Sequence, residues 1–302
     1  MNSIATRYGV LNGITYLKEY AHGGVRECMV NRENRLSTKY GMLIPYYKDD
    51  EHRRKPITPI AFYDNGIIKS ISLQDQTVVT TPIGDFPVEF VSFYEDGSIK
   101  RILHLNGRIT GYWSEENEYD IAQEFDFSFE FGKFRKKIIG IYFYKGGTVK
   151  SITLWPQDSV EVRLPFGSIG VRTGIALYPE GGIKSVEPCK SVPVPTPIGS
   201  ITAFDINSVG VHGDTNSLGF YEDGRIKNLV TSFDEITVEG ENGYSAVYRP
   251  ASRDDEGKTI RRPLDIQFFD GKIMIDNTGS GVYEIDKYTF KISKFKGWAS
   301  GG

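Results

Sequence analysis

The stretch Tyr94-Glu95-Asp96-Gly97-Ser98-Ile99-Lys100 decides the fold, because the same seven-residue motif returns through most of the chain. The motif reads Tyr-x-x-Gly-x-Ile/Val-Lys, and other copies begin at Tyr20, Tyr63, Tyr144, Tyr178 and Tyr221. The copy at Tyr20 has Arg26 in the place of Lys, and a degenerate seventh copy begins at Phe268. Repeats with a period of about 20–50 residues build stacked arrays, solenoids or propellers.

Each copy has the pattern of a β-hairpin. An alternating strand such as Ile60-Ala61-Phe62 precedes the Tyr, so its two large apolar side chains share one face. Turn residues follow, as in Asp-Asn-Gly. The second strand, Ile68-Lys69-Ser70-Ile71, breaks the alternation and predicts a bulge at its Lys-Ser pair. We also expect the motif glycines to lie in equivalent turns with positive φ; they are Gly66, Gly97, Gly147, Gly181 and Gly224.

A second marker, usually Thr-x-x-Gly, follows each motif at a similar distance. Three copies lead to Thr38–Gly41, Thr81–Gly84 and Thr196–Gly199. The others lead to Leu164–Gly167, Thr237–Gly240 and, much earlier in its copy, Arg108–Gly111. Because a marker accompanies each motif, the repeating unit is longer than the seven-residue motif.

Composition supports the same fold class. The 302 residues include 33 Gly, 14 Pro, 18 Tyr and 18 Phe, which suits many short strands and tight turns. The net charge of −3 gives no support for nucleic-acid binding, which a basic excess would indicate. The N-terminus lacks the apolar run of a signal peptide, and no apolar run is long enough to cross a membrane. We therefore expect a cytoplasmic protein.

The sequence predicts an all-β repeat array of stacked hairpins or three-stranded units. A β-solenoid or an extended meander sheet would build such an array, and a propeller-like closure is the alternative. We place the array at residues 1–243 and a C-terminal β cap with the degenerate seventh copy at residues 244–302. Arrays need such atypical ends to cover the exposed core.

The motif is similar to the bacterial variety of MORN-like repeats, which commonly read Tyr-x-x-Gly-x-Leu/Ile-Lys. The resemblance covers about seven residues in each copy, as in Tyr94–Lys100. It implies an elongated all-β scaffold linked to protein–protein contacts, sometimes to lipid surfaces, and occasionally to toxin–antitoxin or envelope proteins. This chain departs from the family where a third strand ending in Thr-Pro-Ile-Gly replaces the Gly-rich second half of the unit.

No catalytic signature stands out in the sequence. The two cysteines, Cys28 and Cys189, are far apart, and Cys28 takes the place of core Ile, Val or Leu in other copies. The four histidines, at positions 22, 52, 104 and 212, have no metal-binding spacing. A phosphate-binding loop, a dinucleotide fingerprint and a nucleophile elbow are missing from the sequence. We therefore expect no enzyme, cofactor or metal.

Two side-chain columns would form if the copies stack in register. The Tyr column contains Tyr63, Tyr94, Tyr144, Tyr178 and Tyr221, and the Lys column contains Lys69, Lys100, Lys150, Lys184 and Lys227, extended by Arg26. The tyrosines would either cover neighbouring turns or form an aromatic strip that binds a partner or sugar rings. The lysines would either form a solvated face or attract an anionic partner, an attraction that the interleaved carboxylates weaken.

The connections between copies vary most in length, so they are free to carry recognition. The longest, residues 112–137, contains Trp113, Tyr119, an acidic cluster and four alternating Phe at 125–131 that predict a strand. It is either an ordinary extra hairpin, or its Phe face packs inward while Trp113, Tyr119, Glu115 and Glu116 form a partner-binding rim. The best helical segment, at 118–125, is weak. The charged connection at residues 46–56 predicts a solvated loop.

Three functions fit these patterns. The first is a non-catalytic scaffold that binds another protein, and the second is a carbohydrate-binding or glycan-hydrolysing protein that uses exposed Tyr and Trp. The third is a peripheral membrane-associated module. Exposure of Trp113, Trp155 and Trp298 beside acidic residues in a cleft would favour the second over the first.

Overall fold

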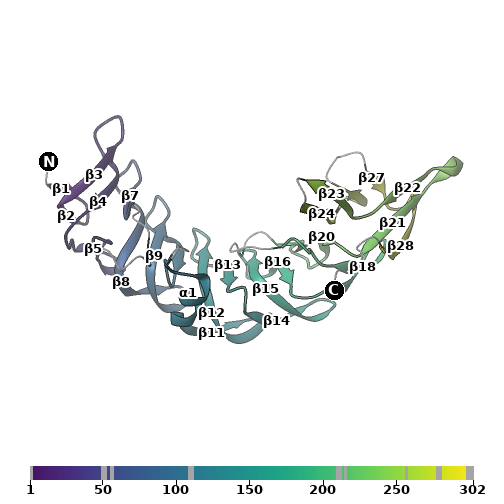
Figure 1. The fold of residues 1–302 in the computed structure, drawn as a ribbon, viewed down its shortest axis with the longest axis horizontal. Coiled ribbons are helices and arrows are strands. Elements are labelled where there is room, and N and C mark those ends of the chain that lie inside the picture. The colour runs from purple at the N-terminus through teal and green to yellow at the C-terminus, as the bar shows by residue number, and fades with distance from the viewer. Residues whose placement is uncertain are drawn as a thin grey trace. The chain divides into compact units, whose positions relative to one another are not determined.

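The computed structural model describes residues 3–48, 53–54, 58–107, 112–208, 213, 216–255, 258–276 and 281–296, with the side chains of 253–259 left out. Trp298, His52, His212 and the marker at 108–111 lie outside these residues. The regular secondary structure is nearly all β, as the sequence predicts, with 60% of the residues in strands and 4% in helices (Figure 1). None of the described helices is long and apolar enough to cross a membrane.

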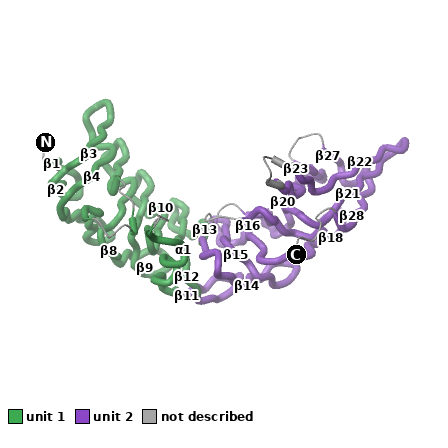
Figure 2. The backbone as a smooth tube through the Cα atoms, viewed as in Figure 1, with its two compact units in different colours: residues 1–125, 136–152 green, residues 126–135, 153–302 purple. Residues whose placement is uncertain are grey.

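Contacts divide the chain into two compact units (Figure 2). Unit 1 comprises Met1–Phe125 and Lys136–Ile152, and unit 2 comprises Asp126–Arg135 and Thr153–Gly302. The long strand β12 (Gly132–Phe143) belongs to both, and each unit is described by itself below.

Unit 1 is an antiparallel meander. Its main sheet pairs the strands in the order β3–β4–β7–β8–β9–β10–β12. The strands with most of their residues in unit 1 are β1 (Ser3–Thr6), β2 (Gly9–Asn12), β3 (Ile14–Glu19), β4 (Val25–Val30), β5 (Leu36–Thr38), β6 (Gly41–Leu43), β7 (Ile60–Phe62), β8 (Ile68–Thr81), β9 (Gly84–Phe93), β10 (Ile99–Leu103) and β13 (Val149–Leu154). The helix α1 (Glu115–Ile121) follows β10.

Unit 2 continues the same construction in the order β14–β15–β16–β19–β20–β25–β26–β27. Its strands are β11 (Glu124–Phe129), β14 (Ser159–Leu164), β15 (Gly167–Leu177), β16 (Ile183–Pro188), β17 (Val192–Thr196), β18 (Gly199–Ala203), β19 (Leu218–Phe220), β20 (Ile226–Thr231), β21 (Asp234–Glu239), β22 (Ser245–Tyr248), β23 (Ala251–Asp255), β24 (Lys258–Arg262), β25 (Leu264–Phe269), β26 (Lys272–Ile275), β27 (Val282–Glu284) and β28 (Thr289–Lys294). A 3-10 turn η1 (Glu241–Gly243) precedes β22, and β21, β22 and β28 form a separate three-stranded sheet. Of the expected architectures, the structure shows the meander, and the described strands form no closed barrel.

The motif forms one kind of hairpin, which we call the Tyr-hairpin. The amide of Tyr63 donates to the carbonyl of Ile67, and the amide of Gly66 donates to the carbonyl of Tyr63. Gly66 has φ +77°, so glycine avoids the strain that a side chain would meet there. The predicted positive φ is confirmed at the other motif glycines, Gly97, Gly147, Gly181 and Gly224.

The bulge predicted at the Lys-Ser pair is also confirmed. Phe62 pairs with Ile68 and Ala61 pairs with Ser70, so Lys69 is the extra residue. The strand pairing leaves out the equivalent residue in four other copies, namely Lys100, Lys184, Lys227 and, in the first copy, Arg26. The bulge explains how apolar residues spaced by three and then by two, Ile68, Ile71 and Leu73, all become buried.

The Thr-x-x-Gly markers form a second kind of hairpin with a two-residue turn, which we call the Thr-hairpin. Thr81 pairs with Gly84, and its hydroxyl donates to the carbonyl of Gly84 at 2.8 Å. Thr38–Gly41 and Thr196–Gly199 have the same bond, as does Thr6–Gly9, which our reading of the sequence missed. The prediction of a marker at Thr237–Gly240 is wrong, because Thr237 lies inside β21 opposite Val247.

Thr-hairpins pack on the turns of Tyr-hairpins two copies further along the chain. The hydroxyl of Tyr40 donates to the carbonyl of Gly97 at 3.2 Å. A methyl group on Gly147 would lie 3.1 Å from Cγ of Pro82, and one on Gly224 would lie 3.1 Å from Cγ of Pro165. The marker is therefore the element that covers the motif turns.

The seventh copy begins one residue later than Phe268, the start expected from the sequence. Phe268 pairs with Ile273 as Phe220 pairs with Ile226, so Phe268 takes the position before the motif Tyr. Asp270 and Gly271 then form a tight turn with φ of +47° and +72°, without a bulge. Cys28 is fully buried among core residues, as expected, and burial raises the pKa of its thiol to about 12.

Candidate functional site

The Tyr column has a structural role in the described copies. The hydroxyl of Tyr63 donates to the carbonyl of Phe93 in the next copy at 2.8 Å. The same bond joins Tyr20 to Phe62, Tyr94 to Phe143, Tyr178 to Phe220 and Tyr221 to Phe268. Burial raises the pKa of Tyr63, Tyr94 and Tyr178, which keeps these hydroxyls protonated as donors. Tyr144 begins the same kind of turn, because its backbone amide donates to the carbonyl of Thr148.

The Lys column lies on the tyrosine rings. The ammonium of Lys100 is 5.6 Å from the centroid of Tyr94, and Lys69, Lys184, Lys227 and Arg26 lie over their own motif tyrosines in the same way. Lys150 instead lies over Tyr142. Cation–π contacts of this kind hold the exposed lysine stems along the sheet. The geometry favours the structural reading of both columns over a free aromatic strip.

The longest connection is joined to the charged connection by a buried ionic cluster. Arg53 donates to both carboxylate oxygens of Glu89 at 2.7 and 2.9 Å and to both of Glu118 at 3.0 and 2.8 Å. Burial alone would lower the pKa of Arg53, but its bonds to Glu89 and Glu118 raise it. The indole of Trp113 donates to Glu118 at 2.6 Å, and Arg53 lies over the Trp113 ring.

Backbone amides complete the cluster. Gly107 donates to Glu118 at 2.7 Å, and Asn106 donates to Glu89 at 2.7 Å. A methyl group on Gly107 would lie 2.1 Å from the Glu118 carboxylate, so this close approach needs glycine. The prediction of a solvated loop at residues 46–56 is therefore wrong at Arg53 and at the buried Arg54, which donates to the carbonyls of Leu73 and Gln74. The remainder of that connection includes residues outside the described part.

The helix α1 positions the predicted rim. Ser114 caps its N-terminus, with its hydroxyl accepting from the amide of Asn117, which starts the helix three residues earlier than the weak pattern indicated. Trp113 and Glu118 turn inward, and Tyr119 is half-buried with Lys137 4.1 Å from its ring centroid. Glu115 is half-buried and Glu116 is exposed.

The outward surface of this connection differs from the expected rim. Around the helix it includes five exposed residues that we call the α1 face: Tyr112, Glu116, Asn117, Asp120 and Ile121. Tyr112 is 81% exposed and Ile121 is 48% exposed, so two large apolar side chains lie beside two carboxylates. The predicted Phe strand is confirmed as β11 as far as Phe129, whereas Phe131 lies in the turn that follows. Phe127 stacks on Phe134 with ring centroids 5.1 Å apart.

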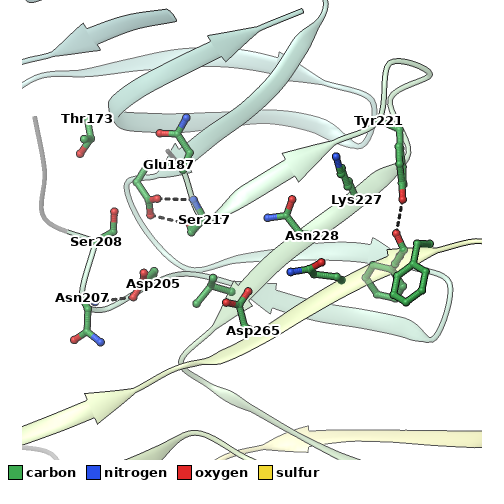
Figure 3. Close-up of a pocket in the computed structure, with 15 residues that line it drawn as sticks. Thr173, Glu187, Asp205, Asn207, Ser208, Ser217, Tyr221, Lys227, Asn228 and Asp265 are labelled. Atoms are coloured by element: carbon green, nitrogen blue, oxygen red, sulfur yellow. Dashed lines mark hydrogen bonds between the residues drawn. The ribbon is translucent and has the colours of Figure 1, made fainter. Parts of the chain in front are cut away.

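Unit 2 contains a cavity of about 790 Å³ whose lining residues are mostly polar (Figure 3). Strands β15, β16, β20 and β25 line it, together with the segments after β18 and around β19. Its lining residues include Thr173, Glu187, Asp205, Asn207, Ser208, Asn216, Ser217, Tyr221, Lys227, Asn228, Asp265, Gln267 and Phe269. Tyr221 is the one predicted binding residue among them.

Glu187 is the most buried charged group of the cavity wall, with 1% of its side chain exposed. It accepts hydrogen bonds from the amide and the hydroxyl of Ser217, both at 2.8 Å. Burial raises the pKa of its carboxyl group, while bonds from Ser217 and Ser208 and the charge of Arg172, 3.9 Å away, oppose that shift. Glu187 therefore fixes the start of β19 without the bidentate arginine that Glu89 has in unit 1.

The cavity wall also carries backbone strain. Thr173 is buried with φ +60°, a left-handed conformation that costs about 1–3 kcal/mol for a residue with a branched side chain. The pairing of β15 with β16 is irregular at this point. A methyl group on Gly174 would lie 2.1 Å from the Cα of Gly213, so two backbone segments meet closely here.

One departure from the repeat pattern lies in the wall of this cavity. Glu187 follows the motif lysine by three residues, where other copies have Ser72, Leu103, Thr153 and Val230. A carboxylate in a position that is otherwise small or apolar departs from the repeat. A departure of this kind indicates a position at which the side chain has a role other than packing.

The comparisons leave the family open: no protein-family model, curated protein or solved structure matches this chain. Among the described residues, no group of three His, Cys, Asp or Glu side chains is placed to hold a metal ion. His104 is used within the fold, since its ring nitrogens contact the carbonyl of Pro87 and the amide of Gln123.

Proposed function

We propose that this chain is a non-catalytic repeat scaffold that binds another protein through its irregular connections. The observation that carries the proposal is the use of the repeated side chains. The Tyr hydroxyls bond the next copy and the Lys side chains lie on the Tyr rings, so recognition falls to residues that differ between copies. The resemblance to MORN-like repeats supports the same role, and the cytoplasmic location expected from the sequence is part of the proposal.

The α1 face is the surface we assign to the partner. Its base is rigid, because Glu118 and Trp113 anchor the helix on Arg53. Its exposed side combines Tyr112 and Ile121 with the carboxylates of Glu116 and Asp120. Binding hot spots are enriched in Tyr, and charges around an interface steer association. We therefore expect a partner whose contact surface is apolar with basic residues at its rim.

Co-purification of the tagged full chain, followed by mass spectrometry, tests this proposal. The informative variant is Asp120→Lys with Ile121→Ser, because both side chains are exposed and a cation suits the C-terminal turn of a helix. The matched control is Glu180→Lys with Glu222→Lys, which changes exposed acids in two motif turns. The partner should be lost from the first variant and retained by the control. Equal retention by both would overturn the assignment to the α1 face.

A further inference from the structure

The cavity of unit 2 is a feature that the proposed scaffold role does not explain. Its volume of about 790 Å³ lies within the range of about 300–1,000 Å³ that small-molecule sites occupy. Figure 3 shows a polar end around Glu187, Ser217 and Ser208, and an end at which Tyr221 bonds a carbonyl. Asn228 and Asp265 lie between these two ends (Figure 3).

A comparison within the chain shows why the cavity forms in this place. Along one row of the sheet in unit 2, Gly219 pairs with Asn228, which pairs with Gln267. The corresponding row in unit 1 pairs Ser92 with Arg101 and Arg101 with Tyr142. There the guanidinium of Arg101 lies 4.7 Å from the centroid of the Tyr142 ring and covers the row.

Gly219 is the residue that leaves room on the sheet. A methyl group there would lie 2.3 Å from Oδ1 of Asn228, so glycine allows Asn228 to lie over the strand. The equivalent position holds Ala61 and Ala176 in other copies, where the facing residue is a serine. Small residues on the strand and amides beside them therefore replace the Arg–Tyr stack of unit 1.

The chemistry of the lining is that of hydroxyl recognition. Asn228 and Gln267 each offer an amide donor and an acceptor oxygen, which suits groups that also donate and accept. Phe269, which is half-buried, adds an aromatic ring to the wall, whereas the ring of Tyr221 already has Lys227 and Arg225 over it. We infer that this cavity binds a neutral, polyhydroxylated ligand of the size of a mono- or disaccharide.

Three charged side chains of the wall, Glu187, Asp205 and Lys227, already have contacts within the protein, which favours a neutral ligand. The Glu187 carboxylate is occupied by the amide and hydroxyl of Ser217. Asp205 accepts from the amide of Asn207 at 2.8 Å, and Lys227 lies over the ring of Tyr221. The side chain of Asn228 is half-exposed and lies between the two ends of the cavity (Figure 3).

The test applies an array of neutral glycans to the full chain, followed by calorimetry with the best-bound disaccharide. Arginine and glucose 6-phosphate serve as cationic and anionic probes. Asn228→Leu removes the hydrogen-bonding groups of the amide and keeps the branching at Cγ, and Gly219→Ala displaces the amide with a residue that other copies carry. Arg101→Leu changes the same repeat position in unit 1 and is the control. Thermal unfolding confirms that each variant folds.

We expect at least one neutral saccharide to bind, with affinity about tenfold or more lower in Asn228→Leu and Gly219→Ala and unchanged in Arg101→Leu. Asp120→Lys with Ile121→Ser should leave saccharide affinity unchanged, so this result is independent of the partner-binding proposal. The inference is overturned if no neutral glycan binds, if only arginine or glucose 6-phosphate binds, or if the two cavity variants bind as the unmodified chain does.

Discussion

The hydroxyl of Tyr63 donates to the backbone carbonyl of Phe93, 2.8 Å away and one copy further along the chain. Phe93 directly precedes Tyr94, whose hydroxyl makes the same bond to Phe143. Four motif tyrosines therefore fix the strand that carries the next motif tyrosine: Tyr20, Tyr63, Tyr94 and Tyr178. Because the bond is repeated, the tyrosines determine how successive hairpins align.

Removing one of these hydroxyls should destabilise the array modestly. We expect Tyr63→Phe to lower the free energy of unfolding by about 0.5–1.5 kcal/mol, the usual net contribution of one hydrogen bond. Urea denaturation measures the change. Tyr16→Phe, at a ring that is 44% exposed, is the control and should be neutral. Equal stability of Tyr63→Phe, Tyr94→Phe and the unmodified chain would show that these bonds do not support the fold.

Two adjacent glycines allow a matched test of the motif turn. Gly181 has φ +93° and open space around its Cα, while Gly182 has equally open space without a positive φ. Gly181→Val should cost about 1–3 kcal/mol because of backbone strain. Gly182→Val should cost far less, since other copies place Ile67, Ser98 or Thr148 there. Similar unfolding free energies for the two variants would contradict the turn assignment.

Breaking the ionic cluster around Arg53 should lower the free energy of unfolding much more than removing one tyrosine hydroxyl does. Arg53→Leu would leave the carboxylates of Glu89 and Glu118 buried without their arginine. We expect a loss of about 3–5 kcal/mol in the unfolding free energy, which is typical when one partner of a buried ion pair is removed. Arg35→Leu removes an exposed pair with Glu33 and should change stability by less than about 1 kcal/mol. A loss of similar size in both variants would place Arg53 in solvent.

Glu187 predicts a specific pH dependence of stability. Because burial raises its folded-state pKa, the unfolded chain ionises first, and stability falls as pH rises from the ordinary glutamate value through the folded value. Above the folded pKa this contribution stays constant. Glu187→Gln should remove it, so the stability difference between the variant and the unmodified chain should grow with pH over that window. A difference independent of pH would mean that the folded pKa is not raised.

The repeat motif made much of the fold predictable. The spacing of Ile68, Ile71 and Leu73 could be satisfied only by an extra residue at Lys69, and the structure has that bulge. Turn composition likewise led to the positive φ of the motif glycines. These features are local, since each depends on a few residues whose side chains alternate between two faces.

The ionic cluster and the cavity could not be predicted in this way. Arg53 meets Glu118 across 65 residues of sequence, and nothing local distinguishes it from its charged neighbours. The cavity depends on Gly219, Asn228 and Gln267 meeting on three different strands. Such sites become visible only once the register of the sheet is known.

The most direct test of the scaffold account is photo-crosslinking of the full chain to its partner. A photoreactive amino acid replaces Glu116 on the α1 face in one variant and Glu222 in a motif turn in the other, and both positions are exposed. The account predicts that the partner is crosslinked from position 116 and not from position 222. A partner that co-purifies with both variants but is crosslinked only from position 222 would contradict it, because recognition would then belong to the repeated turns.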